Sequence, residues 1–301
     1  MLLSIIICSY NRANYIGEAL DALYHQTASL DKFEVLVIDN NSTDGTPEVF
    51  AQWRASHPNG QFYYQTETKQ GASYARNTGA KNAKTEWLCF IDDDAVAANN
   101  FVENIHRHIQ AYPDRVGFGG RIIPRYLPSE PKWMSYYVSS MVGNFDYAPV
   151  ACAFEDGKYP LESNMVVNKK IFDLIGGFNT MLPGVVGTLR IGGEGKDLFY
   201  KIMALGNSIY YDPSIIVEHV VEVKKLTKEY LYRVASGIGR GEKSRTKAIS
   251  QWAYIKKIIE YLFKFAAAIV LGIKYALQGN PAKTGPIIQF RIDTLLGLIG
   301  R

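Results

Sequence analysis

The hydrophobic pattern of the first hundred residues alternates between buried strands and amphipathic helices. Three continuous apolar runs each lead into polar residues, at 4–10 (SIIICSY), 33–40 (FEVLVIDN) and 86–94 (EWLCFIDDD). Such runs are typical of parallel strands that are buried on both faces. Helical periodicity lies between and around them, at 14–26, 42–53 and 73–83. This alternation predicts βαβ units and an α/β fold, with a Rossmann-like, mostly parallel sheet flanked by helices.

The second half of the chain is less regular. We expect a strand at 116–124, an irregular excursion at 125–160, a short strand and helix at 162–179, and a helix that ends at Gly206. A strand-like run at 208–221 is interrupted by Pro213, and basic helical sequence begins at 224. The pattern predicts one domain over 1–222, with halves of about 1–120 and 121–222, and a basic, amphipathic helical extension over 223–301.

Three adjacent carboxylates follow one buried run, at Asp92, Asp93 and Asp94. Their mutual repulsion becomes tolerable if a cation neutralises them, and aspartate oxygens are hard ligands that suit Mg²⁺ or Mn²⁺. Such ions also bridge phosphate oxygens and stabilise the charge of a leaving group. The alternative is a solvated loop in which an aspartate caps a helix.

Polar residues also close the other two runs. Asp39 ends the second run, and Ser9, Tyr10 and Asn11 end the first. Ligands bind at the carboxyl ends of strands in open α/β sheets, so we expect these groups to converge on one edge. Asp39 suits a base or ribose donor and Tyr10 suits stacking on a ring, although each is equally compatible with a turn or with plain packing.

Composition and charge narrow the partners. The chain is 47% hydrophobic with a net charge of +4, which gives no reason to expect nucleic acid. Between 224 and 257, however, ten Lys and Arg face two Glu, which favours an anionic surface as partner. Three cysteines without CxxC spacing support neither a zinc knuckle nor a disulfide framework. A reducing, cytoplasmic compartment fits, and the N-terminus lacks the basic region of a signal peptide.

Four motifs in this order carry a family resemblance: SIIICSYNR, VLVIDNNSTDGT, GASYARNTGA and WLCFIDDDA. Together they resemble family 2 glycosyltransferases with the GT-A fold, over roughly residues 3 to 220. The resemblance implies an inverting enzyme that uses Mn²⁺ or Mg²⁺ and a nucleotide-sugar donor, usually a UDP-sugar.

The resemblance also implies site residues. The nucleobase would be held by Ser9, Tyr10, Asn11 and Asp39. Asp92 and Asp94 match the outer positions of the DxD motif: the first contacts ribose or sugar and is a further candidate ligand, and the last binds the metal. Asp93 occupies the variable middle position beside the donor. Arg76 matches a basic position near the donor, with a surface arginine as the alternative. His219 matches a histidine that completes the metal's coordination, with a structural histidine as the alternative.

The acidic motif on the acceptor side departs from the family pattern. The family has Glu-Asp-x-Asp/Glu-Leu at the start of a helix, and this chain has Glu194, Gly195, Lys196, Asp197 and Leu198. An inverting displacement needs a carboxylate base, which we assign to Glu194 with Asp197 as the alternative. Both acids would also favour a helix N-terminus through its dipole. Gly195 leaves open a weak or inactive enzyme.

Two further groups of residues complete the predicted site. Glycines at 184, 187, 192 and 193 surround Arg190, in a loop that could close over the donor and place Arg190 on a phosphate or a charged sugar. An ordinary surface loop is the alternative. Glu162 and Asn164 are candidates for contact with acceptor hydroxyls.

The C-terminal stretch 258–277 holds 20 mostly apolar residues, enough to consider a membrane span. Glu260, Lys264 and Lys274 argue against one, because charges deep in hydrocarbon are costly. With the basic run before it and a second amphipathic piece at 286–300, we favour a helix lying in the membrane interface. A packed or dimerisation helix and a true span are the alternatives.

We therefore expect a glycosyltransferase, peripheral at the inner face of the cell membrane, that acts on a hydroxyl of a saccharide or lipid-linked acceptor. A nucleotidyltransferase acting on a sugar phosphate could share the sheet and the acidic site, but ICSYNRANY lacks a glycine-rich, basic phosphate loop. A non-catalytic binder of nucleotide sugars is the third possibility, because of Gly195.

Overall fold

The computed structural model describes residues 2–186, 189–191 and 193–300, and the side chains of 185–192 lie outside the description. The chain forms two compact units. The first, which we call the sheet unit, comprises Met1–Ile123, Phe145–Met181 and Gly195–Val220. The second, the helical unit, comprises Pro124–Asn144, Leu182–Glu194 and Val221–Arg301.

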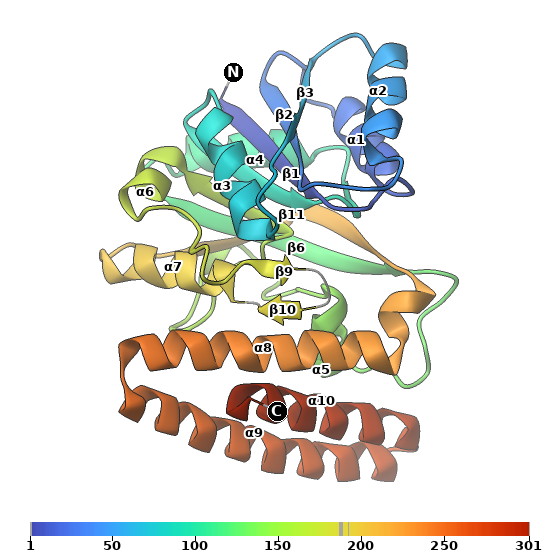
Figure 1. The fold of residues 1–301 in the computed structure, drawn as a ribbon, viewed down its shortest axis with the longest axis vertical. Helices are drawn as coiled ribbons and strands as arrows, with labels where there is room; N and C mark the ends of the chain where they lie inside the picture. Colours follow the sequence, from blue (N-terminus) through green and yellow to red (C-terminus); the bar gives the residue numbers. More distant parts are fainter. Residues whose placement is uncertain (1, 187–188, 192, 301) are drawn as a thin grey trace. The chain divides into compact units, whose positions relative to one another are not determined.

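The sheet unit is built on a mixed sheet with the strand order β3-β2-β1-β4-β8-β6-β11-β5 (Figure 1). The first four strands are parallel: β3 (Gln61–Thr66), β2 (Phe33–Asp39), β1 (Leu3–Ser9) and β4 (Trp87–Asp92). Antiparallel pairing then adds β8 (Asn164–Asn168) to β4 and β6 (Gly117–Tyr126) to β8. The long strand β11 (Tyr210–Val221) pairs with β5 (Ala95–Ala97) and with β7 (Cys152–Ala153).

Helices accompany this sheet, and all of them except α4 lie where the sequence pattern predicts a helix. They are α1 (Ile16–Tyr24), α2 (Thr46–Ser56), α3 (Ala72–Asn82), α4 (Phe101–Ala111), α6 (Lys169–Leu174) and α7 (Glu194–Ala204). The α/β fold with a helix-flanked sheet is confirmed. Gly206, with a φ of 86°, follows the end of α7 in the left-handed conformation that commonly closes a helix.

Continuous apolar runs form the parallel strands because both faces of the sheet are buried. In β1, Ile5 and Ile7 pack in one hydrophobic cluster and Ile6 packs in the other, on the opposite face. Gly79 lets α3 approach closely, since a Cβ there would lie 2.4 Å from the Cγ2 of Ile6. The register pairs Ser9 with Asp39 and Cys8 with Asp92, so three strands end at the same edge.

The helical unit has its own core. Three long helices dominate it: α8 (Lys228–Ile249), α9 (Gln251–Leu277) and α10 (Thr284–Ile299). Shorter elements are α5 (Tyr136–Ser139), the 3₁₀ turns at Ser140–Val142, Val223–Leu226 and Pro281–Lys283, and the hairpin of β9 (Gly184–Val186) and β10 (Leu189–Ile191). Val138, Val234, Ala268 and Phe290 belong to one buried cluster that joins α5, α8, α9 and α10. Among the described residues, no helix is long and apolar enough to cross a membrane.

Candidate metal and donor site

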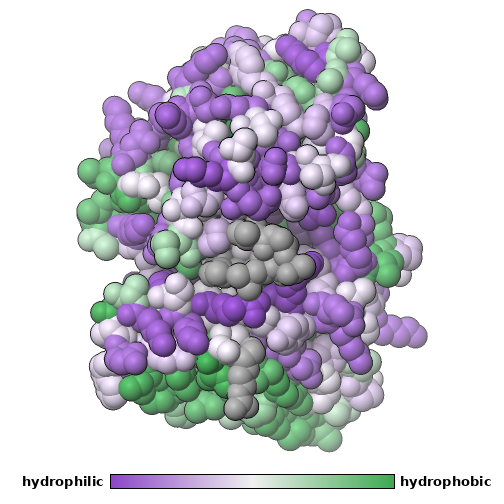
Figure 2. Space-filling model, viewed as in Figure 1, coloured by the Kyte–Doolittle hydropathy of each residue, from purple (hydrophilic) through white to green (hydrophobic). Residues whose placement is uncertain are grey.

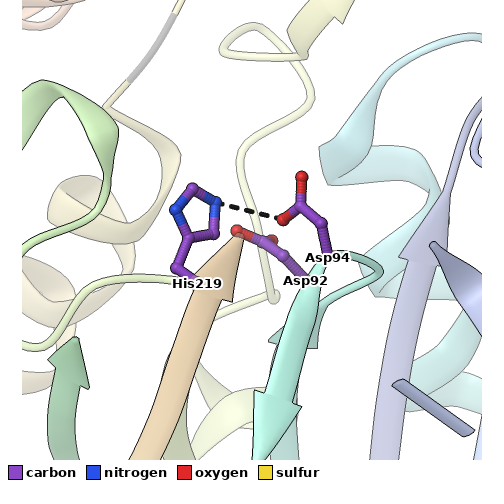
Figure 3. Close-up of side chains that lie close together, drawn as sticks. All are labelled: Asp92, Asp94 and His219. Atoms are coloured by element: carbon purple, nitrogen blue, oxygen red, sulfur yellow. Dashed lines mark ion pairs between the residues drawn. The ribbon is translucent and has the colours of Figure 1, made fainter. Parts of the chain in front are cut away.

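Three side chains converge at the edge where β4 ends. Asp92, Asp94 and His219 each offer a ligand atom, and these atoms lie within 4.8 Å of one another (Figure 3). The Nε2 of His219 lies 3.0 Å from the Oδ1 of Asp94. Asp94 and His219 are buried, whereas Asp92 is half-buried. Ligands of one ion each lie about 2.1 Å from it, so small side-chain rotations bring all three onto a single cation.

The strand pairing explains why residues 125 positions apart meet here. β4 stops at Asp92, and the chain turns through Asp93 and Asp94 into β5, which runs antiparallel to β11. In that register His219 pairs with Ala95, and the amide of Val220 donates to the carbonyl of Asp94 at 2.9 Å. β11 continues through Pro213, where the sequence pattern suggested an interruption. The unbroken strand therefore carries His219 to the aspartates.

Two arginines balance the crowded carboxylates. Arg12 lies 3.3 Å from Asp93 and 3.8 Å from Asp94, and Arg76 lies 3.7 Å from Asp92. Burial, followed by the neighbouring charge of Asp94, still raises the pKa of Asp93 to about 7. The two arginines therefore do not fully compensate the negative charge of the carboxylates, and a bound cation would compensate the remainder. Two carboxylates and an imidazole form a donor set that suits Mn²⁺.

Sequence reasoning missed Arg12. It follows Asn11 directly in SYNR, at the end of a predicted strand, and this position was the available signal. Arg76 does lie beside the aspartates: it is buried in α3, with its guanidinium 5.4 Å from the ring of Phe178.

The loops after β1 and β2 are tied together. Asn11 and Asn41 have φ angles of 54° and 67°, a conformation uncommon outside glycine. The Asn11 amide donates to the Ser42 hydroxyl at 2.9 Å, and the Asn11 side chain accepts from the Thr43 amide at 2.8 Å. Asp39 is buried and accepts from both the amide and the hydroxyl of Ser42. Ser9 is buried beside it in the register, and Tyr10 is half-buried. These bonds hold a polar pair of loops next to the aspartates.

The predicted acceptor-side residues fall in different environments. Asn164 is fully buried, and its amide nitrogen donates to the carbonyls of Arg121 and Ile215, each at 2.9 Å. It therefore joins β8 to the adjacent strand β6 and to β11 beyond it, a role that needs no sugar, and its contact with acceptor hydroxyls stays a prediction.

Glu162 sits against the beginning of α7. Its Oε1 accepts from the Gly195 amide at 2.7 Å. A Cβ placed on Gly195 would lie only 2.4 Å from that oxygen. The carboxylate of Glu162 thus occupies the space into which a side chain at 195 would extend, so a larger residue there requires the Glu162 side chain to move.

The remaining candidates lie at or before this helix. Glu194 is the first residue of α7 and is buried. Asp197 lies one turn further, 2.9 Å from the Nζ of Lys201. Arg190 is in β10, but its side chain lies outside the described residues, as do Gly187 and Gly192.

Comparison with known proteins identifies the family. The model of the family described as Glycosyl transferase family 2 matches residues 4–184, more than half of the chain. The chain belongs to this glycosyltransferase family. Glycosyltransferase AglE of Haloferax volcanii is 38% identical over 100 residues, which cover 33% of each protein. The glucosyl-dolichyl phosphate glucuronosyltransferase of the same organism is 24% identical over 184 residues, which cover 60% of this chain and 56% of the relative.

The similarity to the curated relatives extends over only part of each relative's length. The match covers 33%, 36% and 15% of the first three curated relatives. Among solved structures, the mannosyltransferase PcManGT from Pyrobaculum calidifontis, in complex with GDP-Man and Mn²⁺, aligns with a TM-score of 0.66 at 20% identity. The alignment covers 99% of this chain and 87% of PcManGT. At that identity the likeness concerns the fold, and it confirms the GT-A prediction.

Proposed function

We propose that the protein is an inverting, metal-dependent glycosyltransferase that moves a sugar from a nucleotide sugar to an acceptor hydroxyl. The observation that carries the proposal is the cluster of Asp92, Asp94 and His219 at the carboxyl edge of a parallel sheet. Ligands of open α/β sheets bind at this edge. Family membership supports sugar transfer as the reaction.

The three clustered residues would hold Mn²⁺ or Mg²⁺ through two carboxylates and a neutral imidazole. The bound ion would supply positive charge to the diphosphate of the donor as that group leaves. Arg12 and Arg76 flank the same carboxylates and would add fixed positive charge beside a bound diphosphate. Asp93, held by Arg12, would shape this side of the donor site.

We propose a UDP-sugar as the donor, held at the nucleobase by Ser9, Tyr10, Asn11 and Asp39. The tied loops after β1 and β2 support this assignment, since their hydrogen bonds fix polar groups before any ligand arrives. Among the structural neighbours, GalNAc-T7 was solved with UDP, GalNAc and Mn²⁺, TarS with UDP, and PcManGT with GDP-Man. A purine donor is therefore the alternative that a donor screen must include.

For the catalytic base we propose Glu194. A general base must accept the acceptor's proton during attack, and the carboxylate of Glu194 has the chemistry to do so. Asp197, which lies 2.9 Å from the Nζ of Lys201, is the alternative. Glu162 adds a second carboxylate beside the start of α7, where it would bind an acceptor hydroxyl. Arg190 is proposed to meet a phosphate or a charged sugar.

We propose a saccharide or lipid-linked acceptor, and an enzyme that works peripherally at the inner face of a membrane. The domain over 1–222 would perform the transfer and the extension over 223–301 would provide the attachment. The names of two relatives support this class of acceptor: one is a glucosyl-dolichyl phosphate glucuronosyltransferase and another a poly(ribitol-phosphate) beta-glucosyltransferase.

A donor screen tests the proposed reaction. The protein is incubated with Mn²⁺ and a panel of UDP- and GDP-sugars, with and without simple saccharide acceptors, and the released products are identified. Release of free UDP, increased by an acceptor, is the expected result. A parallel incubation replaces the nucleotide sugar by a nucleoside triphosphate and a sugar phosphate, and release of pyrophosphate there would instead indicate a nucleotidyltransferase. Binding of a nucleotide sugar without any release would indicate a non-catalytic binder.

A further inference from the structure

Helix α9 exposes an apolar face along its whole length. Nine large hydrophobic residues between Trp252 and Leu277 are 39–84% exposed: Trp252, Ile255, Ile259, Leu262, Phe263, Ile269, Val270, Ile273 and Leu277. At 100° per residue they fall within an arc of about 120°, and no charged residue lies inside that arc. Figure 2 shows hydrophobic side chains gathered where Figure 1 draws α9. We call these nine residues the α9 apolar face.

The opposite side of α9 is fixed within the helical unit. Tyr261, Ala268 and Gly272 are the buried residues of this helix. The Gly272 carbonyl accepts from the hydroxyl of Thr284 at 2.9 Å, and a Cβ on Gly272 would lie 2.8 Å from the Thr284 methyl group. Because α9 is held on this side, it cannot rotate to bury the α9 apolar face in its own unit.

The charges around the α9 apolar face are positive. Lys256 and Lys274 are both exposed, and they are 18 residues apart, which is five helical turns, so they line the same border of the face. The one acid of α9, Glu260, bonds to Lys257 and Lys264. Residues 221–300 carry fourteen Lys and Arg against five Asp and Glu, whereas residues 1–220 carry 18 against 24. The positive excess therefore belongs to the part of the chain that holds this face.

We infer that the α9 apolar face lies in the interface of an anionic lipid bilayer, with Lys256 and Lys274 at the headgroups. Apolar side chains on one face of a surface helix insert to the headgroup–acyl boundary, and bordering lysines attract anionic lipids. Trp252, at one end of the helix, suits the interface because its ring is amphipathic. The helix axis then lies parallel to the membrane over 27 residues, about 40 Å. The inference rests on the membrane location proposed above and specifies the surface that makes the contact.

Charge decides between the bilayer and a second copy of the chain as the occupant. Two α9 faces packed antiparallel against each other would bring identical lysine borders together, and like charges in contact are destabilising. An anionic bilayer neutralises those lysines instead.

Co-sedimentation of the full chain with vesicles, without any sugar donor, tests the inference. We expect binding to vesicles of phosphatidylcholine mixed with phosphatidylglycerol, and much weaker binding to phosphatidylcholine alone. The triple variant Phe263→Ser/Val270→Ser/Leu277→Ser should lower partitioning by roughly tenfold or more, because three large side chains no longer leave water. Lys256→Gln/Lys274→Gln should lower partitioning onto the mixed vesicles by about tenfold.

The chain offers matched controls. Val150, Leu174 and Met181 are 66%, 72% and 76% exposed, against 72%, 68% and 84% for Phe263, Val270 and Leu277. Val150→Ser/Leu174→Ser/Met181→Ser should leave partitioning unchanged, as should Lys81→Gln/Lys170→Gln, which removes two exposed lysines of the sheet unit. These controls separate a specific face from general hydrophobicity and charge.

Three outcomes would overturn the inference, each for a separate reason. If the full chain ignores mixed vesicles, the membrane location itself fails, while UDP release in solution still reports on the proposed reaction. If the full chain binds but the α9 triple variant binds equally well, another surface makes the contact. If light scattering shows a dimer that the triple variant converts to monomer, a second copy of the chain covers the face.

Discussion

At the residue scale, Gly195 and Glu162 form a complementary pair. The resemblance to the family left a gap in the acidic motif at 195, and the structure fills the corresponding space with the carboxylate of Glu162. Sequence alone could not pair these residues, since 33 positions separate them and nothing local links them. Gly195, which departs from the acidic motif of the family, therefore packs against the carboxylate of Glu162.

The pair yields a swap experiment. Gly195→Asp should lower the melting temperature and the rate of UDP release, since the new Cβ would lie 2.4 Å from the Glu162 carboxylate. Adding Glu162→Ala should recover part of both losses by removing the obstruction. Gly285→Asp is the control, because Gly285 is also the second residue of its helix but has nothing near its Cβ. A double variant no better than Gly195→Asp alone would show that sterics are not the reason for glycine.

The proposed base gives a second prediction at this scale. Glu194→Gln keeps the size of the side chain but cannot accept a proton, so transfer should fall by roughly 10²–10⁴-fold. UDP binding, measured by calorimetry, should stay within about twofold. Asp197→Asn serves as the comparison, since that carboxylate pairs with Lys201. Transfer that survives in Glu194→Gln and disappears in Asp197→Asn would reverse the two assignments.

At the element scale, strand β11 is anchored to helix α4 by a buried polar contact. The Nδ1 of His108 lies 2.8 Å from Asp212, and Ser214 donates to the same carboxylate from its amide at 3.0 Å and its hydroxyl at 2.6 Å. Burial alone would raise the pKa of Asp212, but the bonds from His108 and Ser214 outweigh it and lower the pKa to about 2.

This contact predicts how stability depends on pH. Because the pKa is lower in the folded state than in the unfolded chain, the stabilisation is complete above about pH 4 and is lost as the pH falls toward 2. Asp212→Asn should therefore cost about 1–2 kcal/mol of unfolding free energy at pH 6, after allowance for partial exposure, and about a third of that at pH 2.5. Denaturant unfolding of the native chain and the variant at pH 6 and at pH 2.5 measures this difference in free energy. An equal cost at both values would mean that ionisation of Asp212 does not contribute.

Elements with strong local signals were predictable, and short or non-local ones were not. Strands β1, β2 and β4 could be predicted from their continuous apolar runs, because both faces of the sheet are covered there. Helices α3 and α7 lie where helical patterns predicted them. β3 has one buried position, Phe62, and three exposed ones, so it gave no continuous apolar run. β5 is three residues long, and only its pairing with β11 defines it.

The residues of the candidate site also differ in how far their placement could be predicted from sequence. The convergence of Asp39, Asp92 and Asp94 on one edge of the sheet could be predicted from sequence, since the register of parallel strands brings their ends together. Arg12 could not be assigned, because its ion pairs with Asp93 and Asp94 depend on the loop conformation that Asn11 sets with a positive φ. Asn164 lies at the start of β8, and its side-chain amide donates to the carbonyls of Arg121 and Ile215 on other strands of the sheet.

At the scale of the whole molecule, charge is distributed unevenly along the chain. Residues 1–220 have an excess of six acids, and residues 221–300 an excess of nine basic residues. The structure groups 124–144 and 182–194 with the helical unit as well, an association that no linear pattern could reveal. A domain boundary near 222 stays a prediction, because the compact units are assembled from interleaved segments.

The account depends most on a cation bound by the carboxylates at the end of β4. Calorimetric titration of UDP into the protein, in Mn²⁺ or in chelator, tests that claim directly, with Asp94→Asn as the site variant and the exposed Asp114→Asn as its control. We predict at least about tenfold tighter UDP binding with Mn²⁺ for the native chain and for Asp114→Asn, and loss of that difference in Asp94→Asn. Equal affinity for UDP in Mn²⁺ and in chelator for the native chain would contradict the account.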